Sequence, residues 1–508
     1  MSTRCGKSFI RVEFMPRSNP PPVEKSKITT FSTRSTTNQA SVSINHSFRW
    51  WIGLTLLFAV VVRLAATYGD LAIDEVWTLW FVQNVTHRLI DIIALRHDNN
   101  HLLNTMIMYC LGPDLPGLCY RIPAVVASIA TVWLAKKIST RNGGTSSGLT
   151  TSVLVGASYL LILYGTEARG YAYVVFFAYL SWLYLQKLEQ SEGRVDAIIF
   201  ALSCSLGFLA HLTFLYCYAG FLIWTIWKFV AKPSRMLVVA QILPMMMAVF
   251  LYLFFIRGMG IGGGDETQLF GAILSTLSVA VGGPTAGDLS LIAAVLTTAL
   301  MLVAFFQLWQ TDRATAACFF TIIVLAPTCV LMATGHDLVY PRYFLIPVAF
   351  ALLMFGDLGA RSGKRGPSSR YVQAGIIGLY LVGNVWWTVR LFDHGRGDYS
   401  HAMAWMAEQG RDRSETVSSD HDFRNALLFG YYSHRLWGDD VKLRYVSQQE
   451  LPQTGTDWAI VHDFEGDPPI QEMQEDRFGN KYQLKRVFRH HSLTGWNWWV
   501  YHRIERSK

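Results

Sequence analysis

The sequence predicts a mainly α-helical, polytopic membrane protein with a small α/β domain at its C-terminal end. Three observations support this fold class. The chain of 508 residues is 51% hydrophobic and only 16% charged, whereas a soluble chain is about a quarter charged. Apolar stretches long enough to cross a bilayer recur through most of it. From residue 392 onward the composition changes to dense charge and aromatic side chains.

The first 48 residues are polar, basic and rich in Ser, Thr and Pro, and they lack the apolar core of a signal peptide. We expect a disordered cytoplasmic tail, followed by a first span that also serves as the export signal. The net charge of +8 lies in short loops between the spans, where it is an orientation signal, so no nucleic-acid partner is expected. Without a C-x-x-C pair, the seven cysteines indicate neither a zinc knuckle nor a disulfide framework.

Residues 49–391 are expected to form a transmembrane domain of about eleven helices. The segment 101–112 is too short to cross and is followed by Pro113 and Pro116, so we expect an interfacial helix there. The predicted spans are 49–69, 118–138, 149–166, 169–186, 197–211, 213–229, 236–256, 289–309, 314–334, 342–356 and 371–391.

Basic loops set the predicted orientation. Lys136–Arg141, Lys228–Arg235 and Arg361–Arg370 each carry at least three basic residues and no acid, which places them in the cytoplasm. With this parity, the loops that contain the remaining charged clusters face the exoplasmic side, and so does the 392–508 domain. These loops hold Asp74/Glu75, His97–His101, Glu167–Arg169, Asp265/Glu266 and His336–Arg342. Charged groups that are scattered in the sequence are therefore expected to meet at one face of the membrane.

The 392–508 segment is expected to form a small exoplasmic α/β domain. "DYSHAMAWMAEQG" reads as a helix that ends at Gly410, and "FRNALLFGYYS" as a second helix. "ETVSSD", "DWAIVHD" and "GWNWWVYHRI" alternate in the manner of strands.

The first candidate catalytic residues are Asp74 and Glu75, in the stretch "GDLAIDEVW" after the first span. Solvated acids at a span end are the simplest explanation. However, Ile73, Val76 and Trp77 flank the pair with apolar side chains, as expected for acids held in an interfacial pocket. A carboxylate in such a pocket can act as a general base toward a hydroxyl or an amine.

The second candidate is the pair Asp98 and His101 in "RHDNNHLLN", three residues apart on one face of a helix. Such a pair can bind a phosphate or a divalent cation. The cofactor that the pattern suggests is the divalent cation. No second pair of ligands is visible, so a metal site is a weak prediction. A polar cap that starts the interfacial helix is the alternative.

The remaining candidates are Glu167 and Arg169 in "YGTEARGYAYVV", and Arg342 and Tyr343 in "HDLVYPRYFLIP". The planar guanidinium suits phosphate oxygens, so both arginines are candidates for binding an anionic headgroup. An ion pair that anchors a helix end is the alternative for Glu167 and Arg169, and snorkelling to the interface is the alternative for Arg342. His211 reads as a helix-cap histidine.

The order of these motifs resembles the C-type (GT-C) fold of membrane glycosyltransferases, and in particular the protein O-mannosyltransferases and the lipid A aminoarabinose transferase. It runs from the acidic pair through "NNHLLNTMIMYCLG", "YRIPAVVASIATVWLAKKI", "EARGYAY" and "AHLTFL" to "YPRYFLIP", and covers about 49–391. Relatives often have His-Pro-Pro or a Lys where this chain has "NNH".

The resemblance implies an enzyme that takes a sugar from a polyprenyl phosphate and works on the exoplasmic face. It places Asp74 in the catalytic position, Glu167 in the second acidic position, and Arg169 and Arg342 beside the carrier phosphate. Neither a G-x-G-x-x-G nor a Walker pattern occurs in the chain.

We therefore predict a glycosyltransferase that moves a single hexose or pentose to an exoplasmic lipid, glycan or protein by inverting displacement. Membrane lipids are its surroundings, and the inner (plasma) membrane of a bacterium is its expected location. The alternative from another class is a flippase or transporter of a lipid-linked glycan, which would place polar groups near the bilayer midplane. A scaffold or signalling protein would not need acids and arginines in five loops.

Overall fold

The computed structural model describes residues 38–262, 268–335, 339–362, 367–410, 414–463 and 471–505. Asp265, Glu266 and His336, which sequence analysis singled out as loop residues, lie outside these ranges. The chain divides into two compact units, Met1–Ser47 and Phe48–Lys508. The second unit contains both the helical bundle and the C-terminal sheet.

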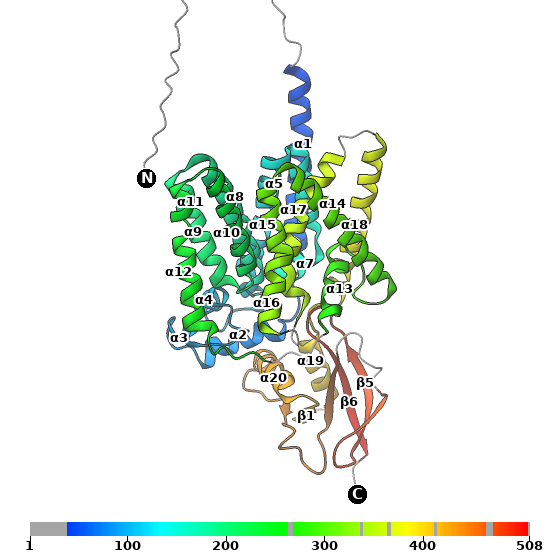
Figure 1. Ribbon diagram of the computed structural model, residues 1–508. Helices are drawn as coiled ribbons and strands as arrows, with labels where there is room; N and C mark the ends of the chain where they lie inside the picture. The colour runs from blue at the N-terminus through cyan, green and yellow to red at the C-terminus, as the bar shows by residue number, and fades with distance from the viewer. Residues whose placement is uncertain are drawn as a thin grey trace, which may run out of the picture. The chain divides into compact units, whose positions relative to one another are not determined.

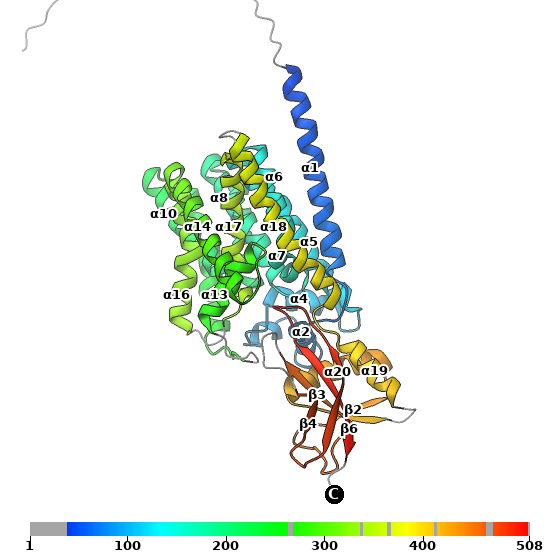
Figure 2. The same cartoon turned by 90° about the vertical axis from the view of Figure 1, so that its right-hand side faces the viewer.

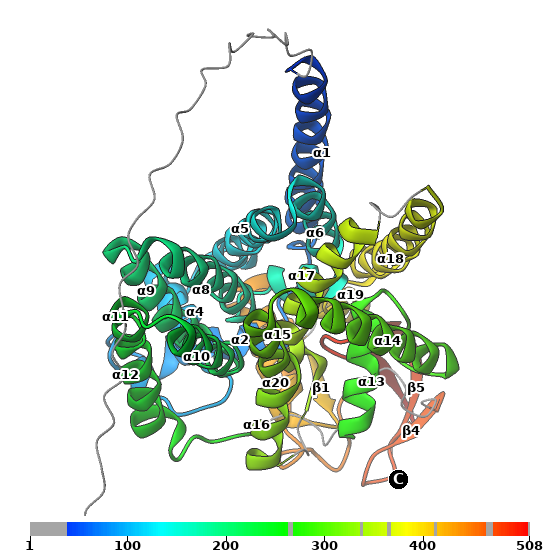
Figure 3. The same ribbon diagram turned by 45° about the horizontal axis from the view of Figure 1, so that its top comes forward.

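Long apolar helices make up the bundle, with α8, α9, α10 and α12 grouped apart from α14 and α18 (Figure 3). Two short 3₁₀ segments, η1 (Tyr164–Thr166) and η4 (Pro341–Phe344), and two π-helical segments, η2 (Tyr252–Ile256) and η3 (Thr321–Leu325), interrupt it. The helices are α1 (Asn38–Ala65), α5 (Gly117–Gly143), α6 (Thr145–Ala157), α7 (Tyr159–Leu163), α8 (Tyr171–Ser191), α9 (Arg194–Ala210), α10 (Phe214–Ala231), α11 (Arg235–Val239), α12 (Ile242–Leu251), α13 (Leu269–Ala280), α14 (Asp288–Thr311), α15 (Arg313–Phe320), α16 (Ala326–Thr334), α17 (Leu345–Ser362) and α18 (Pro367–His394).

The described residues contain seven helices long and apolar enough to cross a membrane, or eight if one bent pair counts as a single span. The predicted count of eleven is therefore not confirmed. Helices stand in the places of all the predicted spans, but four predicted spans are not among the seven: 49–69, 149–166, 169–186 and 197–211, of which 149–166 corresponds to the bent pair. Large apolar side chains such as Leu302 and Leu379 remain exposed on α14 and α18, as expected where lipid covers the surface.

The bent pair is α6 and α7, which meet at an angle of 63° where one straight span was predicted. A break in a helix frees backbone groups that must find other partners inside an apolar environment. Here the side-chain oxygen of Asn384 on α18 accepts the backbone N–H of Tyr159 at 2.7 Å. The partner lies more than 200 residues away in the sequence, so the apolar pattern alone could not reveal the bend.

Three shorter helices lie across one end of the bundle, α2 (Ile73–Asn84), α3 (Asp91–Ala94) and α4 (Leu102–Leu111) (Figure 1). The helix α4 agrees with the interfacial helix predicted for 101–112. The positive φ of Gly112, +85°, ends it in a conformation that favours glycine.

The C-terminal domain adjoins this same end of the bundle (Figure 2). Two helices, α19 (Tyr399–Gln409) and α20 (Asp422–Trp437), accompany one sheet of order β2-β1-β3-β6-β5-β4. The pairs β1–β2 and β1–β3 are parallel, and the remaining pairs are antiparallel. The strands are β1 (Glu415–Ser419), β2 (Leu443–Tyr445), β3 (Trp458–Asp463), β4 (Met473–Glu475), β5 (Lys481–Phe488) and β6 (Asn497–Glu505). Both predicted helices and all three predicted strands are present.

Candidate functional site

Asp74 stands in the first turn of α2 and faces two guanidinium groups. Arg169, from the loop between η1 and α8, donates to Asp74 Oδ2 through Nη1. Arg342, from η4, reaches the same oxygen through its own Nη1 at 3.0 Å. Asn99 orients Arg169, because its Oδ1 accepts from Nη2 of that arginine at 2.9 Å. Three segments that are far apart in the sequence thus meet at one carboxylate.

The electrostatics of Asp74 follow from this arrangement. Burial acts to raise the pKa of the Asp74 carboxyl, but the charges of Arg169 and Arg342 outweigh it and hold the pKa below its usual range. Asp74 is therefore ionised at neutral pH. Arg424, from α20 of the C-terminal domain, adds a weaker effect in the same direction. Both halves of the unit contribute charge to this site.

Glu75 points the other way and is fully buried. Its Oε1 accepts from Arg121 Nε at 2.9 Å and from the backbone N–H of Ala168 at 2.7 Å. Its Oε2 accepts from Arg121 Nη2 at 2.6 Å and from the backbone N–H of Ala72 at 2.8 Å. Burial acts to raise the pKa of Glu75, and the charge and hydrogen bonds of Arg121 outweigh it, so that the pKa is lowered. Glu75 thereby ties the loop before Arg169 to the start of α2.

Asp74, Arg169 and Arg342 line a cavity of about 400 Å³ that has a polar part and an apolar part. Asp98, His101 and Tyr343, three other residues singled out from the sequence, line the same cavity. Its apolar lining comes from α9, η2 and α16, and includes Phe208, Leu209, Phe255, Val330 and Leu331. A ligand with an anionic head and an apolar tail matches this division.

Two histidines occupy the polar part. His101 Nδ1 accepts the backbone N–H of Gly170 at 2.8 Å, and the rings of His101 and His211 lie 4.6 Å apart. Burial and the nearby charges of Arg169 and Arg342 lower the pKa of His211 to about 3, and burial with the charge of Arg169 lowers that of His101 as well. Both rings are therefore neutral at pH 7 and can donate or accept hydrogen bonds.

Tyrosine rings pack beside the guanidinium groups. Arg169 lies 5.1 Å from the ring centroid of Tyr171, and Arg342 lies 4.6 Å from that of Tyr340 and 5.8 Å from that of Tyr343. Such contacts favour a fixed orientation of the cation over the ring face. Snorkelling of Arg342 away from the site is therefore not what the structure shows.

The metal-binding prediction finds no support in the described part of the chain, which contains no group of three or more His, Cys, Asp or Glu side chains able to hold an ion. Asp98 Oδ1 instead lies 2.9 Å from His97 Nδ1, and one ring nitrogen of His101 is already engaged.

Glu167 does not line the cavity. It is buried, and its Oε1 lies 3.5 Å from Nε of Arg396, which follows α18. Burial raises the pKa of Glu167, although the charge of Arg396 opposes the rise. Arg396 also donates to the backbone oxygens of Ala66 and Leu163. Glu167 thus lies outside the lining of the cavity, and its partner Arg396 links the segment after α18 to the end of α1.

Sequence reasoning missed Arg121, Arg396, Arg424 and Trp77. A signal existed for Arg121, because a charge near the start of an apolar span is costly unless it is paired. Arg396 and Arg424 belong to a segment with dense charge, where no single arginine stands out.

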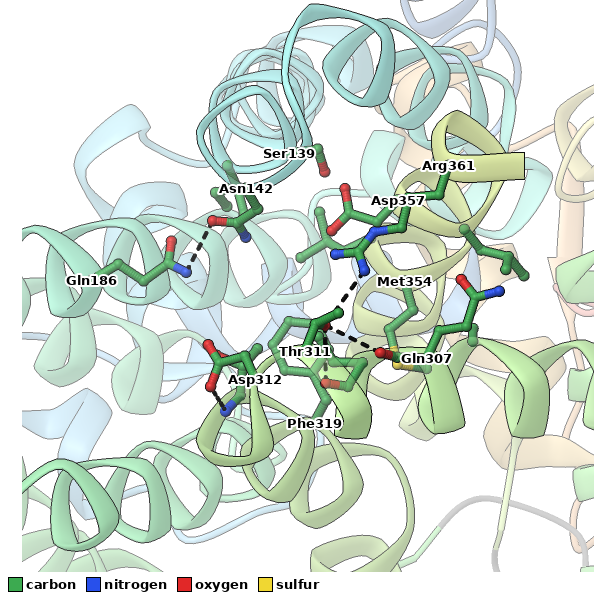
Figure 4. Close-up of a pocket in the computed structure, with 16 residues that line it drawn as sticks. Ser139, Asn142, Gln186, Gln307, Thr311, Asp312, Phe319, Met354, Asp357 and Arg361 are labelled. Carbon is green, nitrogen blue, oxygen red and sulfur yellow. Dashed lines mark hydrogen bonds between the residues drawn. The ribbon is translucent and has the colours of Figure 1, made fainter. Parts of the chain in front are cut away.

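A second cavity, of about 270 Å³, contains none of the predicted site residues (Figure 4). It lies among the C-terminal ends of α5, α8 and α17, whereas the Asp74 cavity adjoins the start of α8. Asn142, Gln186, Asp357 and Arg361 contribute its polar groups.

No family model matches the sequence, and no curated protein matches it. Solved structures with a similar fold include ArnT from Cupriavidus metallidurans bound to undecaprenyl phosphate, with a TM-score of 0.49, 12% identity and coverage of 81% of this chain and 93% of that one. The same protein in the apo state gives a TM-score of 0.49, 10% identity and coverage of 84% and 94%. The Archaeoglobus fulgidus oligosaccharyltransferase in complex with Zn and sulfate gives a TM-score of 0.44, 8% identity and coverage of 81% of this chain and 68% of that one. With TM-scores below 0.5 and identities of 12% or less, these likenesses carry no conclusion about the activity of this chain.

Proposed function

We propose that this protein is a glycosyltransferase that transfers one sugar from a polyprenyl-phosphate donor to an exoplasmic acceptor. The observation that carries the proposal is the carboxylate of Asp74 held between Arg169 and Arg342 at the polar part of a cavity whose other part is apolar. The apolar part suits the polyprenyl chain, the guanidinium groups suit the phosphate, and the carboxylate suits a general base.

The reaction is a direct displacement at the anomeric carbon. An acceptor oxygen or nitrogen forms a bond to that carbon while the bond from the carbon to the phosphate oxygen breaks. The phosphate leaves with the electron pair, and Arg169 and Arg342 stabilise its charge. Asp74 takes the proton of the attacking group. A single displacement inverts the anomeric configuration.

Donor binding would activate Asp74. Without donor, Arg169 and Arg342 both direct their charge at this carboxylate and lower its pKa, which makes it a weak base. When a phosphate shares the same guanidinium groups, it weakens their hold on Asp74 and adds a negative charge nearby. Both changes raise the pKa of Asp74, so its proton affinity increases only when there is a substrate to deprotonate.

The other predicted residues receive supporting roles. Glu75 positions Arg169 through the backbone N–H of Ala168, and Glu167 holds Arg396 behind the site. The neutral His101 and Tyr343 line the cavity, where they can bind sugar hydroxyls or phosphate oxygens. Asp98 lines the cavity near them.

The test uses the purified chain in lipid nanodiscs with synthetic polyprenyl-phosphate sugars. We expect mass spectrometry to detect a polyprenyl-phosphate hexose or pentose that co-purifies, and to identify polyprenyl phosphate as a product of turnover. Asp74→Asn keeps the shape and removes the base, so turnover should fall by roughly 10²–10⁴-fold while donor binding is retained. Near-normal turnover in this variant, or retention of the donor's anomeric configuration, would refute the proposal. An intact lipid-linked oligosaccharide as the bound lipid would instead support a flippase.

A further inference from the structure

A third and larger cavity, a groove of about 960 Å³, lies between α2 and α20. One stripe of α20 lines it, from Phe423 through Leu427 and Tyr431 to Arg435, at the spacing of a single helix face. The opposite wall comes from α2, and the loop 113–116 contributes to the lining. The C-terminal domain and the bundle therefore form this groove together, within the same compact unit.

Trp77 connects the groove to the Asp74 cavity, because its side chain lines both. Its ring packs edge-on against Phe423 of α20, with centroids 4.8 Å apart, and against His97 at 4.5 Å. Asp74 and Trp77 are three residues apart on α2 and so lie on neighbouring positions of one helix face. A molecule in the groove can thus reach Asp74 by passing one indole ring.

The lining combines exposed aromatic rings with neutral amides. Trp80 and Phe423 are 42% and 44% exposed, and Gln83 and Asn84 at the end of α2 are exposed beside them. Such rings offer an apolar face to the C–H groups of a sugar, and amides provide both donors and acceptors for its hydroxyls.

The charges of the groove argue against an anionic ligand. Among the described residues that line the groove, Asp114 is the one carboxylate, Arg435 the one guanidinium and His434 the one imidazole, so the lining contains no cluster of like charges. Arg435 is moreover occupied, since it donates to the backbone oxygen of Leu115 and lies 5.1 Å from the ring centroid of Tyr431. In the part of the groove wall that the structure describes, a phosphorylated or strongly acidic partner would meet no cluster of cations.

We propose that this groove binds the acceptor, and that the acceptor is a neutral oligosaccharide chain whose end extends past Trp77 to Asp74. The inference rests on the proposed transferase function and adds to it the class of acceptor and a role for the C-terminal domain. The groove orients the chain, while the chemistry stays in the Asp74 cavity.

Gly430 offers a test that fills the groove without disturbing the wall. It lies on the groove-facing side of α20, and a Cβ atom added there meets no heavy atom within 4 Å. Gly430→Trp should therefore fold and occupy the space of the ligand. Gly378→Trp is the matched control, since Gly378 is a second exposed helical glycine with open space around it, on α18 and outside the groove.

Binding is measured by saturation-transfer NMR and calorimetry in nanodiscs, with neutral manno-, gluco- and galacto-oligosaccharides of three to six sugars as probes. We expect one series to bind the unchanged protein and Gly378→Trp with similar affinity, and Gly430→Trp to lose at least tenfold. Trp80→Ala, which removes an exposed ring, should weaken the binding of the same oligosaccharide series. It replaces Gly430→Trp as the test variant if Gly430→Trp shows no cooperative thermal transition.

Two results would overturn the inference. One is that no neutral oligosaccharide series binds to the unchanged protein. This includes the case where peptides or phosphorylated glycolipids bind instead and Gly430→Trp blocks their binding. The other is undiminished binding to both groove variants. The transferase proposal can fail independently of this inference. In that case the protein would turn over no polyprenyl-phosphate sugar, while a neutral oligosaccharide would still bind and Gly430→Trp would still block its binding.

Discussion

Replacing Arg342 by glutamine should shift the pH dependence of transfer through its effect on Asp74. The Nη1 atom of Arg342 lies 3.0 Å from Asp74 Oδ2, and the side chains are 24% and 20% exposed. After the replacement, burial still acts to raise the pKa of Asp74, and Arg169 remains as the chief opposing charge. The pKa of Asp74 should therefore rise.

The size of the rise follows from the contact that is lost. A hydrogen bond to a charged group is worth about 1.5–3 kcal/mol, and one pKa unit corresponds to about 1.4 kcal/mol. The pKa of Asp74 should thus increase by about one to two units. A general base must be ionised, so activity is lost as the pH falls through its pKa. The acid limb of kcat/KM should accordingly move to higher pH by the same one to two units.

The assay is the pH profile of sugar transfer, or of donor turnover, extended well below pH 4, because the pKa of Asp74 in the free protein lies below its usual range. Arg88→Gln is the control, because it also removes an arginine paired with an aspartate, but that contact is 3.5 Å long and Arg88 is 79% exposed. Such exposed pairs contribute little, so its profile should match that of the unchanged protein. If Arg342→Gln lowers the rate at every pH and leaves the acid limb in place, Asp74 is not the base that sets this limb.

Two further predictions concern folding and orientation. Glu75→Gln should destabilise the protein by about 3–5 kcal/mol, because it leaves Arg121 buried without its counter-charge, and combining it with Arg121→Met should recover part of the loss in a thermal unfolding assay. Since the folded-state pKa of Glu75 is lowered, the stability from this pair is present above its unfolded pKa and should be lost as the pH falls through the folded one. For the topology, only Ser433→Cys, and not Ser369→Cys, should react with an impermeant thiol reagent from outside. Equal labelling of the two variants would refute the predicted orientation.

The sequence predicted some of the residues that meet at the site, although it missed Trp77 and Arg424 and included Glu167, which does not line the cavity. Asp74, Arg169 and Arg342 come from three separate loops, and the parity of the spans places all three loops at one face. In the structure the three side chains line one cavity. The convergence was predictable because long apolar helices leave few places where ionisable groups can gather.

The bend between α6 and α7 and the groove along α20 could not be predicted in this way. The first depends on one amide of Asn384, on a helix far along the chain, and the second on how the C-terminal domain docks against α2. Apolar periodicity describes how each segment buries itself and carries no information on which distant segment covers it. Trp77 illustrates the point, since its neighbour Phe423 lies more than 300 residues away.

The different roles of Asp74 and Glu75 follow from helix geometry that their adjacency in the sequence conceals. In a helix of 3.6 residues per turn, neighbours point about 100° apart, so the two adjacent acids at the start of α2 point in different directions. Asp74 faces the cavity and remains 20% exposed, while Glu75 faces inward, where Arg121, Ala72 and Ala168 satisfy it. The inward acid fixes the loop that carries Arg169, and Arg169 in turn sets the charge around the outward acid. The two acids therefore act together. The buried carboxylate of Glu75 positions Arg169 through the backbone N–H of Ala168, and Arg169 lowers the pKa of Asp74.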